Sequence, residues 1–238
     1  MKRISKSADE PAELAAYRDR FAKQRPLWNA FKKDSNRTGP VKDALRNDQR
    51  GLCAYCEVKL SPGNETVEHI VSRDKDHDRE LDWQNLLLVC YGDEKSPPPK
   101  EFSCGHARNF AGSPEVLNPL LIPASERLFA VDGRTGELRP DLAACDRSGV
   151  PRHLVQSTLD SLGLRVSRLS RARLRVLETL EEQIARLNDG GLPFDLAERQ
   201  LAGEQFSAHA EWPEFFTTLR WRLGAAAEAR LAEIHFQG

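Results

Sequence analysis

The sequence has 238 residues, 39% of them hydrophobic and 30% charged, which is ordinary for a globular chain and enough to bury a core without disulfide bonds. Its 35 basic and 36 acidic residues leave a formal net charge of −1. This balance argues against a protein that grips nucleic acid by bulk charge, although it allows a local basic face. The odd number of cysteines, five, favours metal ligation or free thiols over a secreted disulfide scaffold.

The chain carries no pattern of a leader or of a membrane span. Residues 1–20 lack the apolar core of a signal peptide, and no apolar run approaches the ~20 residues that cross a bilayer. We therefore expect a cytoplasmic protein with no membrane partner. Residues 236–238 resemble what a protease-site tag leaves behind, so we exclude them from the expected fold.

The N-terminal segment, residues 1–50, is expected to be helical. Apolar residues recur at roughly helical spacing through residues 8–33, with a break expected at Pro26. A second short helix is expected from Pro40 to about Gln49, because proline suits the first turn of a helix.

The middle of the chain changes character twice. In residues 51–115 cysteines, histidines, short apolar runs and turn residues crowd together, as in a small metal-stapled module. The triple-proline stretch at residues 96–100 is expected to be a loop within this module. Residues 116–150 form a connecting segment, in which an Asp-Gly turn inside residues 128–138 predicts a small hairpin.

Residues 151–235 are expected to form a C-terminal helical subdomain. An apolar stripe of helical period runs over residues 155–187 and stops at the glycine pair 190–191. Two further helices are expected over about 195–209 and 213–234, the second opened by proline. The fold class is therefore α+β, with a small metal-stapled module embedded in a mostly helical chain.

The cysteines form the first chemical signal. Cys53 and Cys56 stand two residues apart, a spacing at which one tight turn offers two thiolates to a single ion. Cys90 and Cys104 are the candidates for closing a tetrahedral site, although 13 residues separate them. We predict a structural zinc, with buried free thiols as the alternative. Cys145 lies outside this cluster and is expected to be a packed thiol.

Glu68 and His69 form the second signal. A carboxylate beside a histidine at the end of a strand can hold a divalent cation while the imidazole takes a proton from water. A lone histidine would more often be an ordinary core or surface residue. Flanked by the zinc-type cysteines, the pair becomes a candidate catalytic site.

These motifs resemble those of HNH endonucleases of the ββα-metal type, in which a hairpin and a helix hold one catalytic cation. Over residues 46–180 the chain also resembles the HNH subunit of Septu-type and retron-associated antiphage systems. The resemblance is carried by Cys-Ala-Tyr-Cys-Glu at 53–57, Leu-Asp-Trp-Gln-Asn-Leu-Leu-Leu-Val-Cys at 81–90, Leu-Asn-Pro at 117–119 and Ser-Thr-Leu-Asp-Ser-Leu-Gly-Leu at 157–164.

The resemblance implies a role for each polar residue. His69 would be the general base, and Glu68 would bind the catalytic Mg²⁺ or Mn²⁺. Asn85 would pin the loop and orient the imidazole of His69. The resemblance also makes residues 51–115 a ββα-metal HNH module stapled by zinc.

The closing position departs from the common HNH pattern. An ordinary module has histidine directly after its last cysteine, whereas here Cys104 is followed by Gly105 and then His106. We expect His106 to complete the metal shell, with Asn109 or water as the alternative. Arg108 is expected to contact a phosphate oxygen, a task that suits a planar guanidinium.

Two basic stretches are candidates for holding DNA. One recurs at three and four residues along the long helix and is either a solvated face or a phosphate-tracking one: Arg165, Arg168, Arg171 and Arg175. The other leads into the module and is the better candidate by position: Lys32, Lys33, Arg37, Lys42, Arg46 and Arg50.

The sequence therefore predicts a metal-dependent DNA endonuclease. The resemblance alone implies that it is the effector of an antiphage complex beside an ABC/SMC-like ATPase subunit. The Leu- and Ala-rich helices of residues 151–235 are the hypothetical docking region for this partner. The alternative is a catalytically inactive, zinc-stapled nucleic-acid-binding or adaptor module.

Overall fold

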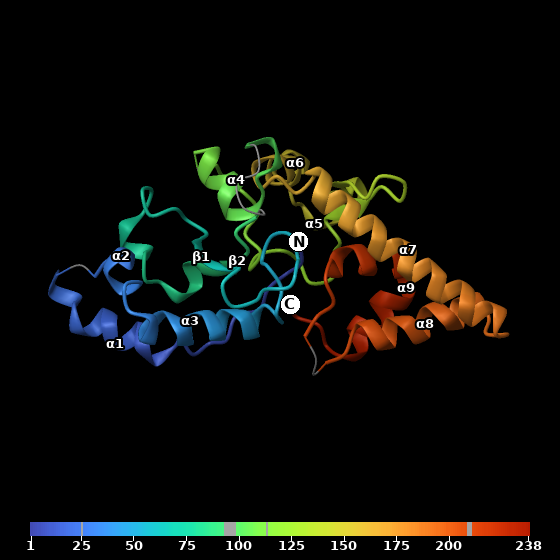
Figure 1. The fold of residues 1–238 in the computed structure, drawn as a ribbon, viewed down its shortest axis with the longest axis horizontal. Helices are drawn as coiled ribbons and strands as arrows, with labels where there is room; N and C mark the ends of the chain where they lie inside the picture. Colours follow the sequence, from blue (N-terminus) through green and yellow to red (C-terminus); the bar gives the residue numbers. More distant parts are fainter. Residues whose placement is uncertain (25, 93–98, 113, 209–210) are drawn as a thin grey trace.

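The computed structural model describes residues 1–24, 26–92, 99–112, 114–208 and 211–238. In chain order the helices and strands are α1 (Ala12–Arg20), α2 (Trp28–Phe31), α3 (Ser35–Asp48), β1 (Thr66–His69), β2 (Leu86–Val89), α4 (Cys104–Phe110), β3 (Phe129–Val131), β4 (Leu138–Pro140), α5 (Leu142–Ser148), α6 (Arg152–Ser161), α7 (Ser167–Asp189), α8 (Phe194–Gln205) and α9 (Phe216–Glu233). The body is elongated, with α1–α3 at one end, α7–α9 at the other and both termini near the middle (Figure 1).

The expected mixture of a mostly helical chain with small sheets is confirmed. Strands β1 and β2 pair antiparallel, with Thr66 opposite Val89 and His69 opposite Leu86. All four residues of β2 are buried, which explains why its sequence is continuously apolar instead of alternating.

Helix α3 covers strand β2 and completes its hydrogen bonding. The buried amide of Gln49 accepts from the Leu88 N–H at 2.8 Å and donates to the Leu88 carbonyl at 2.7 Å. The side chain therefore takes the place of a third strand, so the edge of β2 keeps no unsatisfied polar group at this position.

The N-terminal helices differ from the expectation at one boundary. The expected break near Pro26 is confirmed, because α1 and α2 are separate. The predicted start of the next helix at Pro40 is wrong: α3 begins at Ser35, and Pro40 lies inside it. The side chain of Asp34 accepts from the Asn36 N–H at 3.0 Å, and this N-cap moves the start of the helix upstream of the proline.

The connecting segment forms the expected hairpin. Strands β3 and β4 pair antiparallel, and Asp132 Oδ1 closes the turn by accepting from the N–H groups of Arg134 and Thr135 at 2.9 and 3.0 Å. Helix α5 follows directly and was not expected. Asp141 caps it through a hydrogen bond from the Ala144 N–H at 3.0 Å.

The proline-rich loop can be described only in part. Residues 96–98 lie outside the described residues, and residues 99–101 form a short 3₁₀ turn, η4.

The apolar stripe of residues 155–187 is not one helix. Helix α6 ends at Ser161 and α7 begins at Ser167, and the corner between them presses against the segment before α4. Gly163 adopts a φ of +56°, and a Cβ there would lie 2.1 Å from the Phe102 carbonyl oxygen. The neighbouring Leu162 carbonyl accepts from the Cys104 N–H at 2.8 Å, so the corner holds the start of α4.

The C-terminal helices form a second core. Helices α7, α8 and α9 contact one another, and α7 ends before the glycine pair as expected. Residue 209, at the expected end of the next helix, lies outside the described residues. Phe236 stacks on Phe216, with ring centroids 5.4 Å apart, so its exclusion from the expected fold was wrong.

Among the described residues no helix combines the length and the apolar character needed to cross a membrane.

We predict that Gly163→Ala lowers the free energy of unfolding by about 2–4 kcal/mol, because the new Cβ meets backbone while the residue keeps a positive φ. Gly149→Ala is the matched control, since it has a φ of +70° and open space around its Cβ. Urea denaturation measures both variants. Equal losses would show that the contact with Phe102 does not constrain the corner.

Candidate active site

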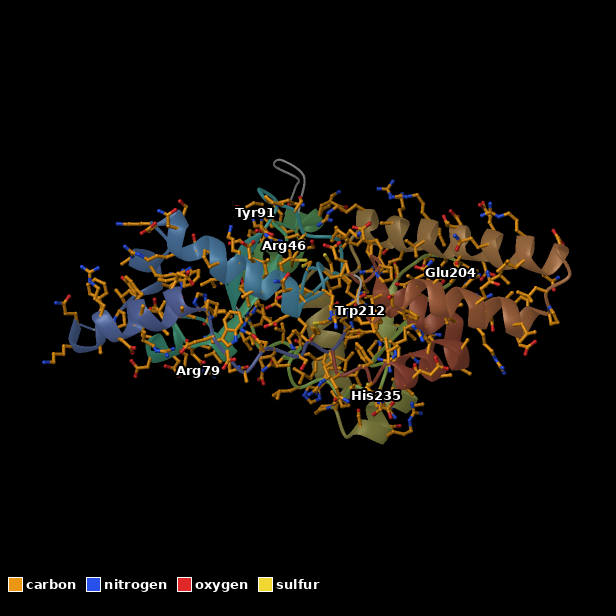
Figure 2. All side chains as sticks on the ribbon, turned by 90° about the horizontal axis from the view of Figure 1, so that it is seen from below. Arg46, Arg79, Tyr91, Glu204, Trp212 and His235 are labelled. Carbon is orange, nitrogen blue, oxygen red and sulfur yellow. The ribbon has the colours of Figure 1, made fainter. Side chains whose placement is uncertain are left out.

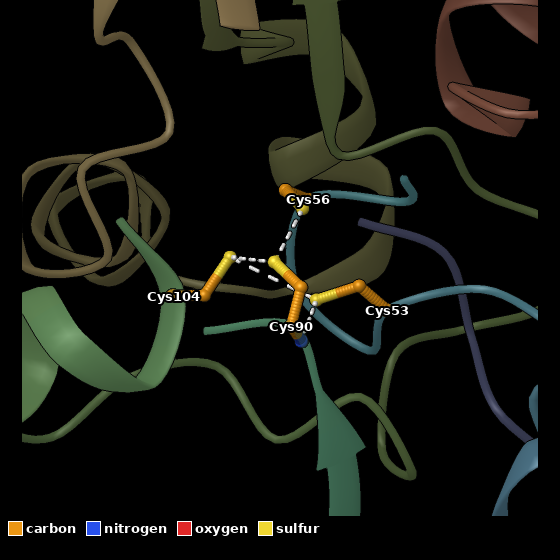
Figure 3. A group of neighbouring side chains, drawn as sticks. All are labelled: Cys53, Cys56, Cys90 and Cys104. Atoms are coloured by element: carbon orange, nitrogen blue, oxygen red, sulfur yellow. Dashed lines mark hydrogen bonds between the residues drawn. The ribbon is translucent and has the colours of Figure 1, made fainter. Parts of the chain in front are cut away.

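Four buried cysteines, Cys53, Cys56, Cys90 and Cys104, converge on one point (Figure 3). Their sulfur atoms all lie within 4.8 Å of one another. The closest separations are 3.5 Å between Cys56 and Cys90, 3.6 Å between Cys90 and Cys104 and 3.7 Å between Cys53 and Cys104. A tetrahedron with Zn–S bonds of ~2.3 Å has edges of ~3.8 Å, so the set fits a four-coordinate metal ion.

Three separate segments supply these thiols. Cys53 and Cys56 stand in the turn between Leu52 and Lys59, which are paired by a β-bridge. Cys90 directly follows β2, and Cys104 is the first residue of α4. A metal ion bound here would link the turn that holds Cys53 and Cys56, the end of strand β2 and the start of helix α4.

Hydrogen bonds within the cluster shift the pKa values of its thiols in opposite directions: they lower the pKa of Cys53, and a hydrogen bond with Cys53 raises the pKa of Cys104. Burial raises the pKa of the Cys53 thiol, but hydrogen bonds from Cys104, Cys56 and Cys90 outweigh it, and the pKa lies well below its ordinary value. The Cys90 N–H also points at Cys53 Sγ, 3.3 Å away. Cys145 is buried in α5 apart from the cluster.

Glu68 and His69 open into a cavity of about 370 Å³. The cavity lies beside the strand pair, and α4 contributes Asn109 to its wall. Both side chains are largely buried, with 8% and 7% of the residue exposed. The structure therefore brings the predicted carboxylate and imidazole to the wall of the same cavity, although they are consecutive residues of strand β1.

The imidazole of His69 is held in one tautomer. Its Nε2 lies 2.9 Å from the Glu80 carbonyl oxygen, which can only accept, so Nε2 carries the hydrogen and Nδ1 keeps its lone pair. The Trp28 ring meets the imidazole edge to face at a centroid distance of 5.3 Å. Burial lowers the pKa of His69 to about 4, so the ring is neutral near pH 7.

Asn85 and Glu80 hold the loop that positions His69. The buried Asn85 amide accepts from the Val71 N–H at 2.7 Å and donates to the Val71 and Arg79 carbonyls at 3.1 and 2.9 Å. This matches the predicted pinning of the loop, and it fixes Arg79, the neighbour of the residue whose carbonyl binds the imidazole.

Glu80 and Trp28 were missed by the sequence reasoning. Glu80 Oε2 accepts from the Trp28 N–H at 2.9 Å, and Oε1 lies 2.8 Å from His77 Nδ1. Burial raises the pKa of Glu80, but these two hydrogen bonds outweigh it and the pKa is lowered. The polar run of residues 73–80 carries no pattern that would single out this carboxylate, since Glu80 owes its burial to a helix distant in sequence.

Arg108 contacts groups of the protein itself, and its expected contact with a phosphate oxygen stays a prediction. The side chain is 3% exposed, and Nη1 donates to Glu68 Oε1 at 2.9 Å and to the His69 carbonyl at 2.7 Å. Nη2 donates to the Ile70 carbonyl at 2.6 Å. Arg108 therefore ties α4 to the end of β1 and orients the Glu68 carboxylate. Burial raises the pKa of Glu68, and the Arg108 charge opposes that shift.

The expected ligand His106 points elsewhere. It is exposed and stacks on Phe102 at a centroid distance of 3.9 Å, outside the cavity wall to which Asn109 belongs. Helical geometry explains this: Arg108 follows Cys104 by four residues and shares its inward face, whereas His106 follows by two and points away. The alternative ligand, Asn109, is the one that the cavity contains.

Gly105 explains the departure from the common closing motif. A Cβ at this position would lie 3.0 Å from Glu68 Oε2 and 3.3 Å from Val89 Cγ2. The second carboxylate oxygen of Glu68 thus lies directly against the α4 backbone. A larger residue after Cys104 would displace the carboxylate.

The expected basic stretch of residues 165–175 does not lie on one helix face, because α7 begins at Ser167 and Arg165 precedes it. Arg168 Nη2 contacts the Gly92 carbonyl and Ser103 Oγ, next to Cys104, and Arg165 pairs with Asp160. In the N-terminal stretch, Arg37 pairs with Asp34 and Arg46 pairs with Asp43 and Glu65. Lys32 and Lys42 line the cavity that contains His69.

A comparison with curated proteins finds the "Retron Ec83 putative HNH endonuclease" of Escherichia coli. This chain is 29% identical to it over 209 residues, which cover 74% of this chain and 79% of that protein. No family model matches the chain.

We predict that Cys90→Ser abolishes metal binding and lowers the melting temperature, because the site loses one of its four thiolates. Elemental analysis of the purified chain should find about one metal ion per chain before the substitution and none after it. Cys145→Ser is the control, since it removes an equally buried thiol outside the cluster. Metal content that is equal in the two variants would contradict the site.

We predict that Arg108→Met lowers the free energy of unfolding by roughly 3–5 kcal/mol, because it leaves the buried Glu68 carboxylate without its partner. Arg79→Met is the control. The Arg79–Asp82 pair is much more exposed, and its loss should cost less than about 1 kcal/mol. Urea denaturation compares them. Similar losses for both would mean that Arg108 does not anchor Glu68.

Proposed function

We propose that the protein is a metal-dependent HNH endonuclease that hydrolyses DNA phosphodiester bonds. The observation that carries the proposal is the joint opening of Glu68, His69 and Asn109 into one cavity beside a four-cysteine cluster. The similarity to a retron protein named as an HNH endonuclease supports the same function. In this proposal, residues 51–115 are the zinc-stapled ββα-metal module within the mostly helical chain.

His69 is the proposed general base. Its Nε2–H is engaged by the Glu80 carbonyl, so Nδ1 is the nitrogen that accepts a proton from the attacking water. A neutral imidazole is required for this step, and the lowered pKa of His69 keeps it neutral at physiological pH. Asn85 and Glu80 are positioning residues that hold the loop behind the ring.

Glu68 and Asn109 are the proposed ligands of a catalytic Mg²⁺ or Mn²⁺. Both offer oxygen donors on the cavity wall, which is the donor type that these ions prefer. Such an ion supplies positive charge to the scissile phosphate when bound. Arg108 holds Oε1 of Glu68, so Oε2, which lies beside Gly105 of α4, is the proposed donor to the ion.

The four cysteines are the proposed ligands of a structural Zn²⁺. All four are buried thiols with tetrahedral spacing, and a closed Cys₄ set is typical of structural zinc. The site leaves no open position for substrate. Its proposed role is to hold strand β2 and helix α4 in register, and with them Glu68 and Asn109.

The proposed setting is an antiphage complex with an ABC/SMC-like ATPase subunit. The name of the E. coli relative supports a retron context, and the resemblance to Septu-type systems supplies the ATPase. Helices α6–α9, in residues 151–235, are the proposed docking region. DNA is the proposed substrate, and the cytoplasm the proposed location.

We predict that His69→Ala lowers plasmid nicking with Mg²⁺ or Mn²⁺ by at least 100-fold, because it removes the general base. His153→Ala removes an exposed histidine of α6 and should leave the rate unchanged. Asn109→Ala should lower the rate and raise the Mn²⁺ concentration required, whereas His106→Ala should do neither.

The nicking rates of these variants distinguish the proposed roles of His69, Asn109 and His106. Equal nicking by His69→Ala and His153→Ala would overturn the catalytic role of His69. A requirement for His106 but not for Asn109 would overturn the proposed ligand set. Absence of nicking in every preparation, with the ATPase subunit added, would favour the alternative of an inactive nucleic-acid-binding module.

A further inference from the structure

We propose that the cavity around His69 is the binding site of an unpaired DNA strand, with Lys32, Lys42 and Arg73 on its phosphates and Tyr91 against a neighbouring base. The inference rests on the proposed nuclease function and deepens it, because it names the strand type and the residues that recognise it. All four side chains belong to the wall of the same cavity.

Three cations surround the opening from two separate segments. Lys32 follows α2, Lys42 lies in α3, and Arg73 comes from the loop after β1. Lys42 Nζ lies 3.3 Å from the Glu65 carbonyl oxygen, and Arg73 donates to Asn29 Oδ1 at 2.8 Å. In the part of the chain that the structure describes, none of the three forms an ion pair with a carboxylate. No carboxylate therefore holds these cations at ion-pair distance, and of the three Arg73 also acts on Glu68 and Glu80, where its charge opposes the rise of the Glu68 pKa and helps to lower the Glu80 pKa.

The acidic groups of the cavity do not cancel this charge. Glu65 is held by Arg46, whose Nη2 donates at 2.5 Å, and Glu68 is held by Arg108. Asp74 is the remaining carboxylate of the wall. A phosphodiester that enters the cavity thus meets three cations and one uncommitted carboxylate besides the proposed metal ligand.

Tyr91 supplies the preference for an unpaired strand. It stands directly after Cys90, lines the cavity and is 48% exposed. In Figure 2 the labelled Tyr91 lies nearer the N-terminal end of the molecule than the labelled Glu204 of α8 does. An exposed aromatic ring beside phosphate-binding cations offers a surface on which a base can stack, and a paired base in a duplex cannot reach it without unstacking.

The burial of His69 points the same way. His69 is 7% exposed and lines the cavity, so a scissile phosphate must enter the cavity to reach it. A flexible single strand can bend into such a recess, whereas a duplex would have to be deformed first. The cations on α7 do not contribute to this wall.

Binding can be measured without cleavage. The test uses the full chain carrying His69→Ala and a fluorescently labelled 20-nucleotide DNA, either single-stranded or annealed to its complement, with anisotropy as the readout. We expect tighter binding to the single strand. Adding Lys32→Ala and Lys42→Ala should reduce the slope of log affinity against log salt by about 0.7 for each lost phosphate contact.

The matched control is Lys23→Ala with Lys33→Ala. This pair removes the same charge from exposed positions of the same region, outside the cavity wall. Its salt slope should stay unchanged. Tyr91→Ala should weaken single-strand binding by roughly 5- to 150-fold, the range for loss of one stacked base, and Tyr91→Phe should restore it.

Equal slopes for the two lysine pairs, tighter binding to the duplex, no binding to either DNA, or undiminished single-strand binding by Tyr91→Ala would each overturn the strand site. The nuclease function fails separately. If plasmid nicking does not depend on His69 while the lysine pairs differ as expected, the binding site stands without that catalytic base. If nicking depends on His69 and the lysine pairs behave alike, the nuclease stands without this strand site.

Discussion

Four cysteine sulfurs from three distant segments meet within 4.8 Å of one another, and the position of every candidate catalytic group depends on this convergence. Cys90 directly follows strand β2, whose partner β1 carries Glu68 and His69. Cys104 begins α4, which carries Arg108 and Asn109. An ion bound between the sulfurs would set the distance from strand to helix, and with it the width of the cavity. The metal-binding cluster therefore acts on the chemistry through geometry, since none of its thiols belongs to the cavity wall.

A second set of interactions orients the side chains that the cysteine cluster brings together. Arg108 reaches back from α4 to Glu68 and to the His69 and Ile70 carbonyls, so one guanidinium fixes the end of β1. Asn85 closes the loop after it. These groups are buried and hydrogen-bonded, so removing one lowers the free energy of unfolding. The same contacts suit them to hold reactive side chains in one arrangement. The C-terminal helices join the same frame, since the corner before α7 accepts a hydrogen bond from the Cys104 N–H. A partner that moved this corner would act directly on the start of α4.

The parts of the fold that the sequence could predict are those with a local cause. The cysteine cluster follows from residue type and spacing, the β3–β4 hairpin from its Asp-Gly turn, and the end of α7 from its glycine pair. The structure differs from the expectation at α4, where the helix sets which side chains point inward, and at the contacts of His69. Arg108 resembles a surface cation in sequence, but its place one helical turn after Cys104 turns it inward. His106 resembles the closing histidine of the common motif, and the same geometry turns it outward. Glu80 and Trp28 support His69 through a contact that no sequence pattern announces.

X-ray absorption at the zinc edge of the purified full-length chain tests the central claim most directly. The account predicts about one zinc ion per chain, surrounded by four sulfur neighbours at ~2.3 Å and no nitrogen or oxygen neighbour. A shell that contains nitrogen or oxygen would mean that His69, His106 or a carboxylate takes the place of a thiolate. A chain that is fully folded without metal would contradict the dependence of the catalytic geometry on the cysteine cluster.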